Sequence, residues 1–449
     1  MSLIMKLPQI IEESKRVYEE ILSSADTSSY QPIEIIGQQV QNNILAKGDN
    51  LSFMKYLIDQ KDLKGKINLI YIDPPFFSNA DYRMEIKLQL NKTKKIQMVQ
   101  KAYQDTWENG MEDYLKMLTV RLYLMKELLA EEGSIWVHLD WHAVHYVKII
   151  MDEIFGSKNF INEIIWHYKS GGANKRCFAK KHDTLLFYAK SRNYYFLAQQ
   201  EKSYNRDLRP YGFKGVKEYQ DKIGWYTMVN RKDVWQLNMV GRTSAERTGY
   251  ITQKPESLIE RILESCTREG DLCADFFGGS GTLSAVASKM KRNWISCDIG
   301  RLATINAYKR LVDAGAEYSF YKERKRQRCG EGSGKIKADV CLQPSDVIDK
   351  MMLRVELLGY EIASDAEIPV QPKFMTIIEE IMNEDPLQLV AYWSIDTHYK
   401  GQPIQPDVCF YKENGKVKTV YESLGTKFGQ VGIKVVDIFG NSTILTVNL

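Results

Sequence analysis

The stretch from Ile67 to Phe76, INLIYIDPPF, decides the fold of this chain. Its first six residues are apolar apart from one asparagine, and they lead into Asp73, which predicts a strand buried on both faces of a parallel sheet. Pro74 and Pro75 stop the strand, because each proline fixes φ and lacks a backbone N–H. Ligands of open α/β sheets bind at the carboxyl ends of the strands. The stretch therefore predicts both the sheet and the edge where its site lies.

Strands and helices alternate on both sides of this stretch. Patterning predicts strands over 43–49, 67–73, 134–140, 272–277 and 294–298, and helices over 51–63, 113–131, 143–155, 255–265 and 284–292. Alternation of this length is typical of parallel β-α-β units. We therefore predict an α/β fold with a doubly wound, Rossmann-like sheet.

The tetrapeptide Asp73-Pro74-Pro75-Phe76 is a candidate catalytic motif. Two prolines remove two backbone donors, so the carboxylate of Asp73 and the local carbonyl oxygens remain as unopposed acceptors, which suits an amino group. Phe76 adds a flat apolar face on which a planar ring can stack. The alternative interpretation is a strand-ending turn with a core phenylalanine.

A second candidate site is the loop Asp275-Phe-Phe-Gly-Gly-Ser-Gly-Thr282 between a strand and a helix. Its glycines allow a ligand to approach the backbone, and the helix start offers free N–H groups. The next strand ends in Asp298, from which an acid can accept both ribose hydroxyls of an adenosine-containing cofactor. A nicotinamide dehydrogenase would need Gly-x-Gly-x-x-Gly, but the third position here is Ser284.

Charge is distributed unevenly along the 449 residues. The whole chain carries a formal net charge of only +4, yet residues 166–255 hold 18 Lys and Arg against 7 Asp and Glu, a local net charge of +11. Sixteen aromatic residues are interleaved with these cations. Such a segment suits a polyanion with stackable bases, although a solvated basic face is the alternative.

The two motifs together resemble a known family, the S-adenosylmethionine-dependent amino methyltransferases of DNA, which modify adenine N6 or cytosine N4. Their catalytic tetrapeptide is Asp/Asn/Ser-Pro-Pro-Tyr/Phe/Trp, and their cofactor loop is Asp-Pro-Phe-x-Gly-x-Gly. Here the catalytic motif precedes the loop with the basic region between them, which resembles the permuted beta class. The resemblance covers about residues 40–310. Phe276 replaces the usual proline, and Tyr250-Ile251 stand where His-Pro often precedes Thr252-Gln-Lys-Pro.

The resemblance implies a role for each matching residue. Asp73 and the Pro74 carbonyl would accept hydrogen bonds from the target amine, and Phe76 would stack on a base flipped out of the duplex. The implied cofactor-binding residues are Asp49 at the adenine end, Lys254 at the methionine carboxylate, Asp275 at the start of the loop, Phe277 on its adenosine side, Gly279 and Gly281 lining it, and Asp298 at the ribose.

The chain divides by composition into four parts. We expect a helical lead over 1–30, a methyltransferase domain over 31–323 with its target-recognition region at about 191–238, a linker over 324–340, and a C-terminal α+β domain over 341–449. The sequence assigns that last domain no function, and DNA contact and partner docking both stay open. No apolar run is long enough for a membrane span, which predicts a cytoplasmic protein.

The expected activity is site-specific methylation of adenine N6 in DNA, because an acid leads the tetrapeptide, whereas cytosine-N4 members of the family more often carry serine. Restriction-modification is one setting for this activity, and regulation and a phage or mobile element stay open beside it. Cytosine N4 and a non-catalytic DNA-specificity component are the alternatives. The resemblance implies S-adenosylmethionine as methyl donor and double-stranded DNA as partner, with a restriction endonuclease or a second copy of the chain as further candidates. We expect no metal, since His138, Asp140 and His142 have no further cluster to complete a site.

Overall fold

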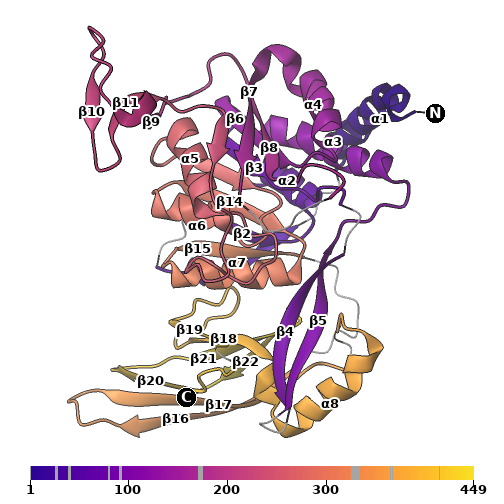
Figure 1. The fold of residues 1–449 in the computed structure, drawn as a ribbon. Coiled ribbons are helices and arrows are strands. Elements are labelled where there is room, and N and C mark those ends of the chain that lie inside the picture. The colour runs from indigo at the N-terminus through magenta and orange to yellow at the C-terminus, as the bar shows by residue number, and fades with distance from the viewer. Residues whose placement is uncertain are drawn as a thin grey trace.

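A computed structural model describes residues 2–25, 29–38, 42–78, 81–90, 94–169, 175–324, 334–364, 366, 368–413 and 415–449. Its centre is a ten-stranded mixed sheet (Figure 1). In spatial order the strands are β1 (Tyr30–Ile36), β15 (Tyr318–Glu323), β2 (Ile44–Lys47), β14 (Asn293–Asp298), β13 (Leu272–Asp275), β3 (Ile67–Ile72), β6 (Leu129–Leu139), β8 (His182–Ala189), β7 (Phe160–His167) and β12 (Val234–Gln236). From β15 to β6 all neighbouring strands are parallel. The predicted doubly wound α/β sheet is confirmed.

Helices cover both faces of this sheet. They are α1 (Leu3–Ser23), α2 (Asn50–Asp59), α3 (Met111–Leu128) and α4 (Val144–Met151) on one face, and α5 (Glu256–Cys266), α6 (Thr282–Lys289) and α7 (Arg301–Asp313) on the other. Along β3, Ile70 and Ile72 are buried with the first group, and Leu69 and Tyr71 with the second. This is the alternation of side chains that a strand imposes, and it explains why the stretch is apolar at both odd and even positions.

A small antiparallel sheet lies inside the predicted target-recognition region. It consists of β10 (Glu218–Gln220), β11 (Trp225–Asn230) and β9 (Gln200–Tyr204). Figure 1 shows it standing away from the central sheet. Short helical turns occur here and elsewhere at Asp152–Gly156, Ser157–Asn159, Arg206–Leu208, Pro372–Phe374 and Pro386–Leu389.

The C-terminal part is an α+β domain with its own core. Its strands are β16 (Lys335–Pro344), β17 (Met351–Glu361) and β20 (Val420–Gly425) in one sheet, and β19 (Val408–Tyr411), β18 (Val390–Asp396), β21 (Val431–Asp437) and β22 (Ser442–Val447) in another, beside α8 (Met375–Glu384). The predicted linker over 324–340 extends too far, because β16 begins at Lys335 and pairs with β17. Its alternation of Ile336 and Ala338 with lysines was hidden by the polar composition. Linker residues 325–333 lie outside the described residues.

A long hairpin that the sequence analysis did not predict joins the two parts of the molecule. It is formed by β4 (Asp81–Leu90) and β5 (Lys94–Gln104), directly after the Asp-Pro-Pro-Phe turn. Figure 1 shows it reaching from the central sheet to α8. Leu88, Ile96 and Met98 of the hairpin are buried in one cluster with Ile378 and Ile381 of α8. None of the helices in the described parts of the chain has the length and apolar character needed to cross a membrane.

A buried ion pair fastens the C-terminal domain to the edge of the central sheet. Glu34 of β1 and Lys434 of β21 are 0% and 3% exposed at their side chains and are in direct contact. Tyr308 of α7 donates a hydrogen bond to Glu34 Oε1 at 2.5 Å. The ammonium of Lys434 also lies 5.8, 5.6 and 5.7 Å from the rings of Tyr308, Phe320 and Tyr392. The pair is thus enclosed by aromatic surface.

Replacing Lys434 by methionine is expected to lower the free energy of unfolding by about 3–5 kcal/mol, because Glu34 stays buried without its counter-charge. Denaturant unfolding measures the loss. The double variant Glu34→Gln/Lys434→Met should recover most of it, since glutamine can still accept from Tyr308 and no charge is buried. A single variant as stable as the wild type would show that the ion pair does not hold the interface.

Candidate active site

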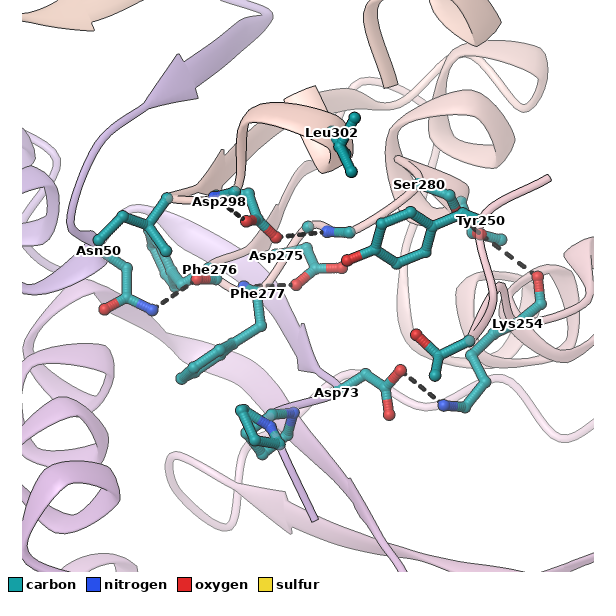
Figure 2. Close-up of a pocket in the computed structure, with 18 of the residues that line it drawn as sticks. Asn50, Asp73, Tyr250, Lys254, Asp275, Phe276, Phe277, Ser280, Asp298 and Leu302 are labelled. Carbon is teal, nitrogen blue, oxygen red and sulfur yellow. Dashed lines mark hydrogen bonds and ion pairs between the residues drawn. The ribbon is translucent and has the colours of Figure 1, made fainter. Parts of the chain in front are cut away.

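A pocket of about 540 Å³ opens at the carboxyl ends of β3, β13 and β14. Three aspartates stand there side by side on the sheet, Asp73 just after β3, Asp275 ending β13 and Asp298 ending β14. All three line the pocket together with Phe277, as Figure 2 shows. Phe76 also lines it. The pocket therefore offers several acceptors and flat apolar faces in one space.

Asp73 forms an ion pair across the pocket. Its Oδ2 accepts a hydrogen bond from Lys254 Nζ at 2.6 Å, as Figure 2 shows. The same ammonium lies 4.9 Å from the centre of the Phe76 ring. The other oxygen, Asp73 Oδ1, is buried and has no hydrogen-bond partner. A buried carboxylate oxygen without a donor is costly, and this one belongs to a residue that lines the pocket.

A buried carboxylate, Asp105, braces the backbone that follows the tetrapeptide. It is 0% exposed and accepts hydrogen bonds from Phe77 N at 3.1 Å, Ser78 N at 2.6 Å, Ser78 Oγ at 2.7 Å and Trp107 Nε1 at 3.1 Å. Phe77 has φ of +60°, a left-handed conformation that a phenylalanine rarely adopts. Asp105 holds that conformation in place, and with it the direction in which Phe76 is presented.

The glycine loop after β13 approaches its neighbours too closely for side chains. A Cβ on Gly278 would lie 2.1 Å from Ser296 Oγ. Gly279 has φ of +49°, and its missing side chain leaves space beneath the ring of Tyr250. Asp298 accepts hydrogen bonds from Gly279 N at 2.8 Å through Oδ2 and from Gly300 N at 2.6 Å through Oδ1. The carboxylate thus fixes the loop, and each oxygen keeps a lone pair for a further donor.

Burial shifts the acid–base properties of Asp275 and Asp298. The pKa of Asp275 lies well above its ordinary value, first because the group is buried and then because Asp73 and Asp298 place negative charge nearby. A hydrogen bond from Phe277 N to Asp275 Oδ1 at 2.9 Å opposes that shift. Burial also raises the pKa of Asp298, and the hydrogen bonds from the backbone N–H groups of Gly300 and Gly279 act in the opposite direction.

Replacing Asp275 by asparagine is expected to stabilise the protein at neutral pH. The folded state holds the Asp275 proton to a higher pH than the unfolded chain does, so the free energy of unfolding falls as pH rises from about 4 through the raised pKa. Asparagine carries no charge and can still accept from Phe277 N. Melting temperatures measured from pH 4 to pH 8 should therefore fall less in the variant. A variant that melts below the wild type at every pH would contradict this account.

A second polar network supports the pocket from α2 and α3. Asp49 caps α2 by accepting from Leu51 N at 3.0 Å, and it also accepts from Arg121 Nη2 at 2.9 Å. Arg121 Nε donates to Asn50 Oδ1 at 2.5 Å, and Asn50 Nδ2 donates to the Phe276 carbonyl at 2.7 Å. The Phe276 carbonyl therefore has a hydrogen-bond partner, and a proline at this position would offer the same carbonyl.

Ten of the eleven sequence-predicted site residues line the pocket, and Gly281 does not. Gly281 is instead the N-cap of α6 with φ of +71°, and a Cβ there would lie 2.9 Å from Ala307 Cβ of α7. Its observed contact is therefore with α7, and it allows α6 and α7 to pack closely. Lys254, expected at a cofactor carboxylate, is paired with Asp73 because opposite charges meet in a partly desolvated pocket.

The histidines that looked like a metal cluster are engaged in other contacts. His138 is fully buried and lies between Tyr71 Oη at 2.9 Å and Asp183 Oδ2 at 3.2 Å, and its ring packs 5.7 Å from that of Phe76. His142 Nδ1 instead contacts Asp140 Oδ2 at 2.7 Å. Within the described residues no group of three or more His, Cys, Asp or Glu could hold a metal ion.

Several residues of the pocket had no clear signal in the sequence. They are Asn50, Tyr71, Trp107, Met117, Arg121, Tyr250, Ile299, Arg301, Leu302 and Pro369. Asn50 follows Asp49 at a predicted helix start, so its position could have been inferred. Arg121 lies in the middle of an amphipathic helix, and Pro369 belongs to the C-terminal domain, so neither position carries a local pattern that points to this pocket.

A family model and the sequences of curated relatives agree on one family. A family model described as DNA methylase matches residues 67–305, a little over half of the chain. The Type II methyltransferase M.HpaI of Haemophilus parainfluenzae is 26% identical over 267 residues, covering 59% of this chain and 74% of the relative. M2.DpnII of Streptococcus pneumoniae is 27% identical over 273 residues, covering 60% and 89%. The solved M1.HpyAVI–SAM complex is 18% identical and covers 60% of this chain and 98% of its own, with a TM-score of 0.38.

Proposed function

Because the chain belongs to the DNA methylase family, whose members methylate exocyclic amines of DNA bases, we propose that it modifies the N6 amine of adenine. The methyl donor in this family is S-adenosylmethionine. Adenine is preferred because an acid, Asp73, leads the tetrapeptide, whereas cytosine-N4 members more often carry serine. The observation that carries the proposal is the buried, unpartnered Asp73 Oδ1 in a residue that lines the pocket together with the half-buried ring of Phe76.

The residues of the cofactor end fit S-adenosylmethionine. Asp298 keeps a lone pair on each oxygen for the two ribose hydroxyls, and Gly279 leaves backbone surface open to the ligand. The carboxylates of Asp73 and Asp298 and the rings of Phe277 and Tyr250 suit a cationic sulfur, which both negative charge and aromatic faces favour. Asp49 and Lys254 stand where the adenine and the methionine carboxylate would lie, and Lys254 keeps two N–H donors besides the one on Asp73.

Catalysis then rests on orientation of the amine. When bound, S-adenosylmethionine supplies a methyl group on a positively charged sulfur. Asp73 Oδ1 and the Pro74 carbonyl would accept hydrogen bonds from the two N–H groups of the amine, which favours the pyramidal form with a lone pair free to attack. As the nitrogen gains the methyl group it would release one N–H proton along its hydrogen bond to Asp73, which passes the proton on to solvent, and the sulfur would leave with its bonding pair as the neutral thioether. The ring of Phe76 stacks on the base, Pro75 fixes the turn, and Asp105 fixes the backbone after it. No covalent bond to the protein is needed.

A base can reach this pocket only if it is turned out of the duplex. We assign DNA contact to the target-recognition region, residues 191–238, whose small sheet stands away from the core in Figure 1. Its lysines and arginines suit phosphates, and exposed Tyr211 and Phe213 suit bases. As the names of its relatives suggest, we place the enzyme in restriction-modification, with a cognate endonuclease as its partner.

Identification of the methylated nucleoside tests this proposal. The protein is incubated with S-adenosylmethionine and mixed-sequence duplex DNA, and the DNA is digested to nucleosides and separated by chromatography with mass detection. We expect N6-methyladenine, at background in an Asp73→Ala control. N4-methylcytosine would replace the adenine assignment and keep the mechanism. DNA that is bound but never methylated would identify a non-catalytic specificity component.

A further inference from the structure

The C-terminal domain touches the wall of the pocket through the turn between β21 and β22. Gly440 in this turn has φ of +81° and packs on Arg301. If Gly440 carried a Cβ, that atom would lie 2.9 Å from the Cβ of Arg301. Arg301 Nη1 donates to the Phe439 carbonyl at 3.4 Å, and Lys47 Nζ donates to the Gly440 carbonyl at 3.3 Å. Arg301 begins α7 and lines the pocket just after Asp298. The turn therefore lies against the outer side of the pocket wall.

A second part of the same domain lines the pocket directly. Pro369 is one of the lining residues, although it is 71 positions beyond Asp298 in the sequence. Its neighbours Ile368 and Val370 pack against the cluster that also buries Phe439 and Ile381. The turn and the segment around Pro369 thus share one apolar core.

The two contacts meet at the end of the pocket formed by Ile299, Arg301 and Leu302. These residues directly follow Asp298, the proposed ribose acceptor, so a base attached to that ribose would lie among them. Leu302 and Pro369 present apolar surfaces, which suit the face of a planar heterocycle. Figure 2 shows Leu302 on the Asp298 side of the pocket, away from Asp73.

From this arrangement we infer that the C-terminal domain completes the nucleoside end of the cofactor site, so that affinity for the adenosine moiety depends on the docked position of that domain. The inference rests on the proposed function. It gives the C-terminal domain a role that is neither DNA contact nor partner docking. The buried pair of Glu34 and Lys434 then has the function of holding this wall in place.

A pair of glycine variants tests the docking contact. Gly440 and Gly415 both lie in turns of the C-terminal domain, with φ of +81° and +82°. Alanine costs the same backbone strain at both positions, but only at Gly440 does the new Cβ meet another side chain, since Gly415 has nothing within 4 Å. Titration calorimetry with S-adenosylhomocysteine on the full-length chain should show Gly440→Ala binding about fivefold or more weakly, and Gly415→Ala within twofold of the wild type.

A second pair tests the wall itself and does not depend on the turn. Pro369→Ala removes the lining ring, and Pro372→Ala changes an exposed proline three residues away that does not line the pocket. We expect Pro369→Ala to bind S-adenosylhomocysteine several-fold more weakly than the wild type and Pro372→Ala to bind it equally well. The two variants should have similar melting temperatures. If Gly440→Ala fails to fold, this pair decides.

The outcomes separate the inference from the function on which it rests. A wild type that does not bind S-adenosylhomocysteine contradicts the proposed function. A wild type that binds it, together with Pro369→Ala and folded Gly440→Ala variants that bind equally well, overturns the inference and leaves the proposed function standing.

Discussion

Alanine in place of Asp73 is expected to lower the rate of methyl transfer by about a thousandfold or more while changing cofactor affinity only a few-fold. The variant loses the carboxylate that would hold the amine in its reactive geometry, an electrostatic contribution that commonly amounts to about 10²–10³ per group. It also loses the partner of Lys254, which weakens positioning of Phe76 beneath that ammonium. Single-turnover transfer of a labelled methyl group measures the rate, and calorimetry with S-adenosylhomocysteine measures the affinity for the cofactor.

Two further variants separate the acceptor role of Asp73 from its ion pair. Asp73→Asn keeps one carbonyl oxygen and should retain more activity than alanine. Asp73→Ala/Lys254→Met leaves no unpaired ammonium. Assayed at saturating S-adenosylmethionine, because Lys254 is also the proposed contact of the methionine carboxylate, it should be as inactive as the single variant if the missing acceptor is the cause. Activity restored in the double variant would assign the loss to the unpaired lysine instead. A fully active Asp73→Ala protein would rule out the proposed catalytic turn.

The second large effect is expected at Asp298. Replacing it by alanine leaves Gly279 N and Gly300 N without their acceptor and removes the proposed ribose contact. Losing a charged hydrogen-bond acceptor and relaxing the loop should weaken binding of S-adenosylhomocysteine about a hundredfold. Calorimetry on the folded variant measures this change directly.

Asp221 offers a matched control for that variant. It also accepts from two backbone N–H groups, those of Ile223 at 2.9 Å and Gly224 at 3.3 Å, but it lies in the turn between β10 and β11 of the target-recognition region. Asp221→Ala should leave cofactor affinity unchanged. Equal affinity losses in the two variants would mean that general destabilisation, and no ribose contact, explains the effect.

Local patterns were sufficient to predict the centre of the fold. The run Ile67–Ile72 has apolar side chains on both faces of the strand, so burial on both sides of the sheet could be inferred from that stretch alone. The same holds for the loop that begins at Asp275, because glycines and strand-ending acids are local signals. With their flanking turns, these two segments hold seven of the ten predicted residues that line the pocket, and the other three, Asp49, Lys254 and Asp298, come from other strand ends and turns.

Contacts between distant segments account for what the sequence did not reveal. The hairpin β4–β5 has many lysines and glutamines, and its packing partners are in α8, almost 300 residues later. Asp105 has no motif of its own, and its importance becomes visible only when Phe77 and Ser78 donate to it. Gly281 matched the loop motif, but Ala307 of α7 packs against it, and nothing in the sequence indicated this contact.

The central claim is that one pocket holds both a methyl donor and a DNA amine, and product stoichiometry tests it most directly. The wild-type protein is incubated with S-adenosylmethionine and duplex DNA, and methylated base and S-adenosylhomocysteine are both quantified by mass spectrometry. The account predicts equal amounts of the two products, with neither formed when DNA is omitted. S-adenosylmethionine that is bound but never converted in the presence of DNA, or that is converted without any methyl group in the DNA, would contradict it.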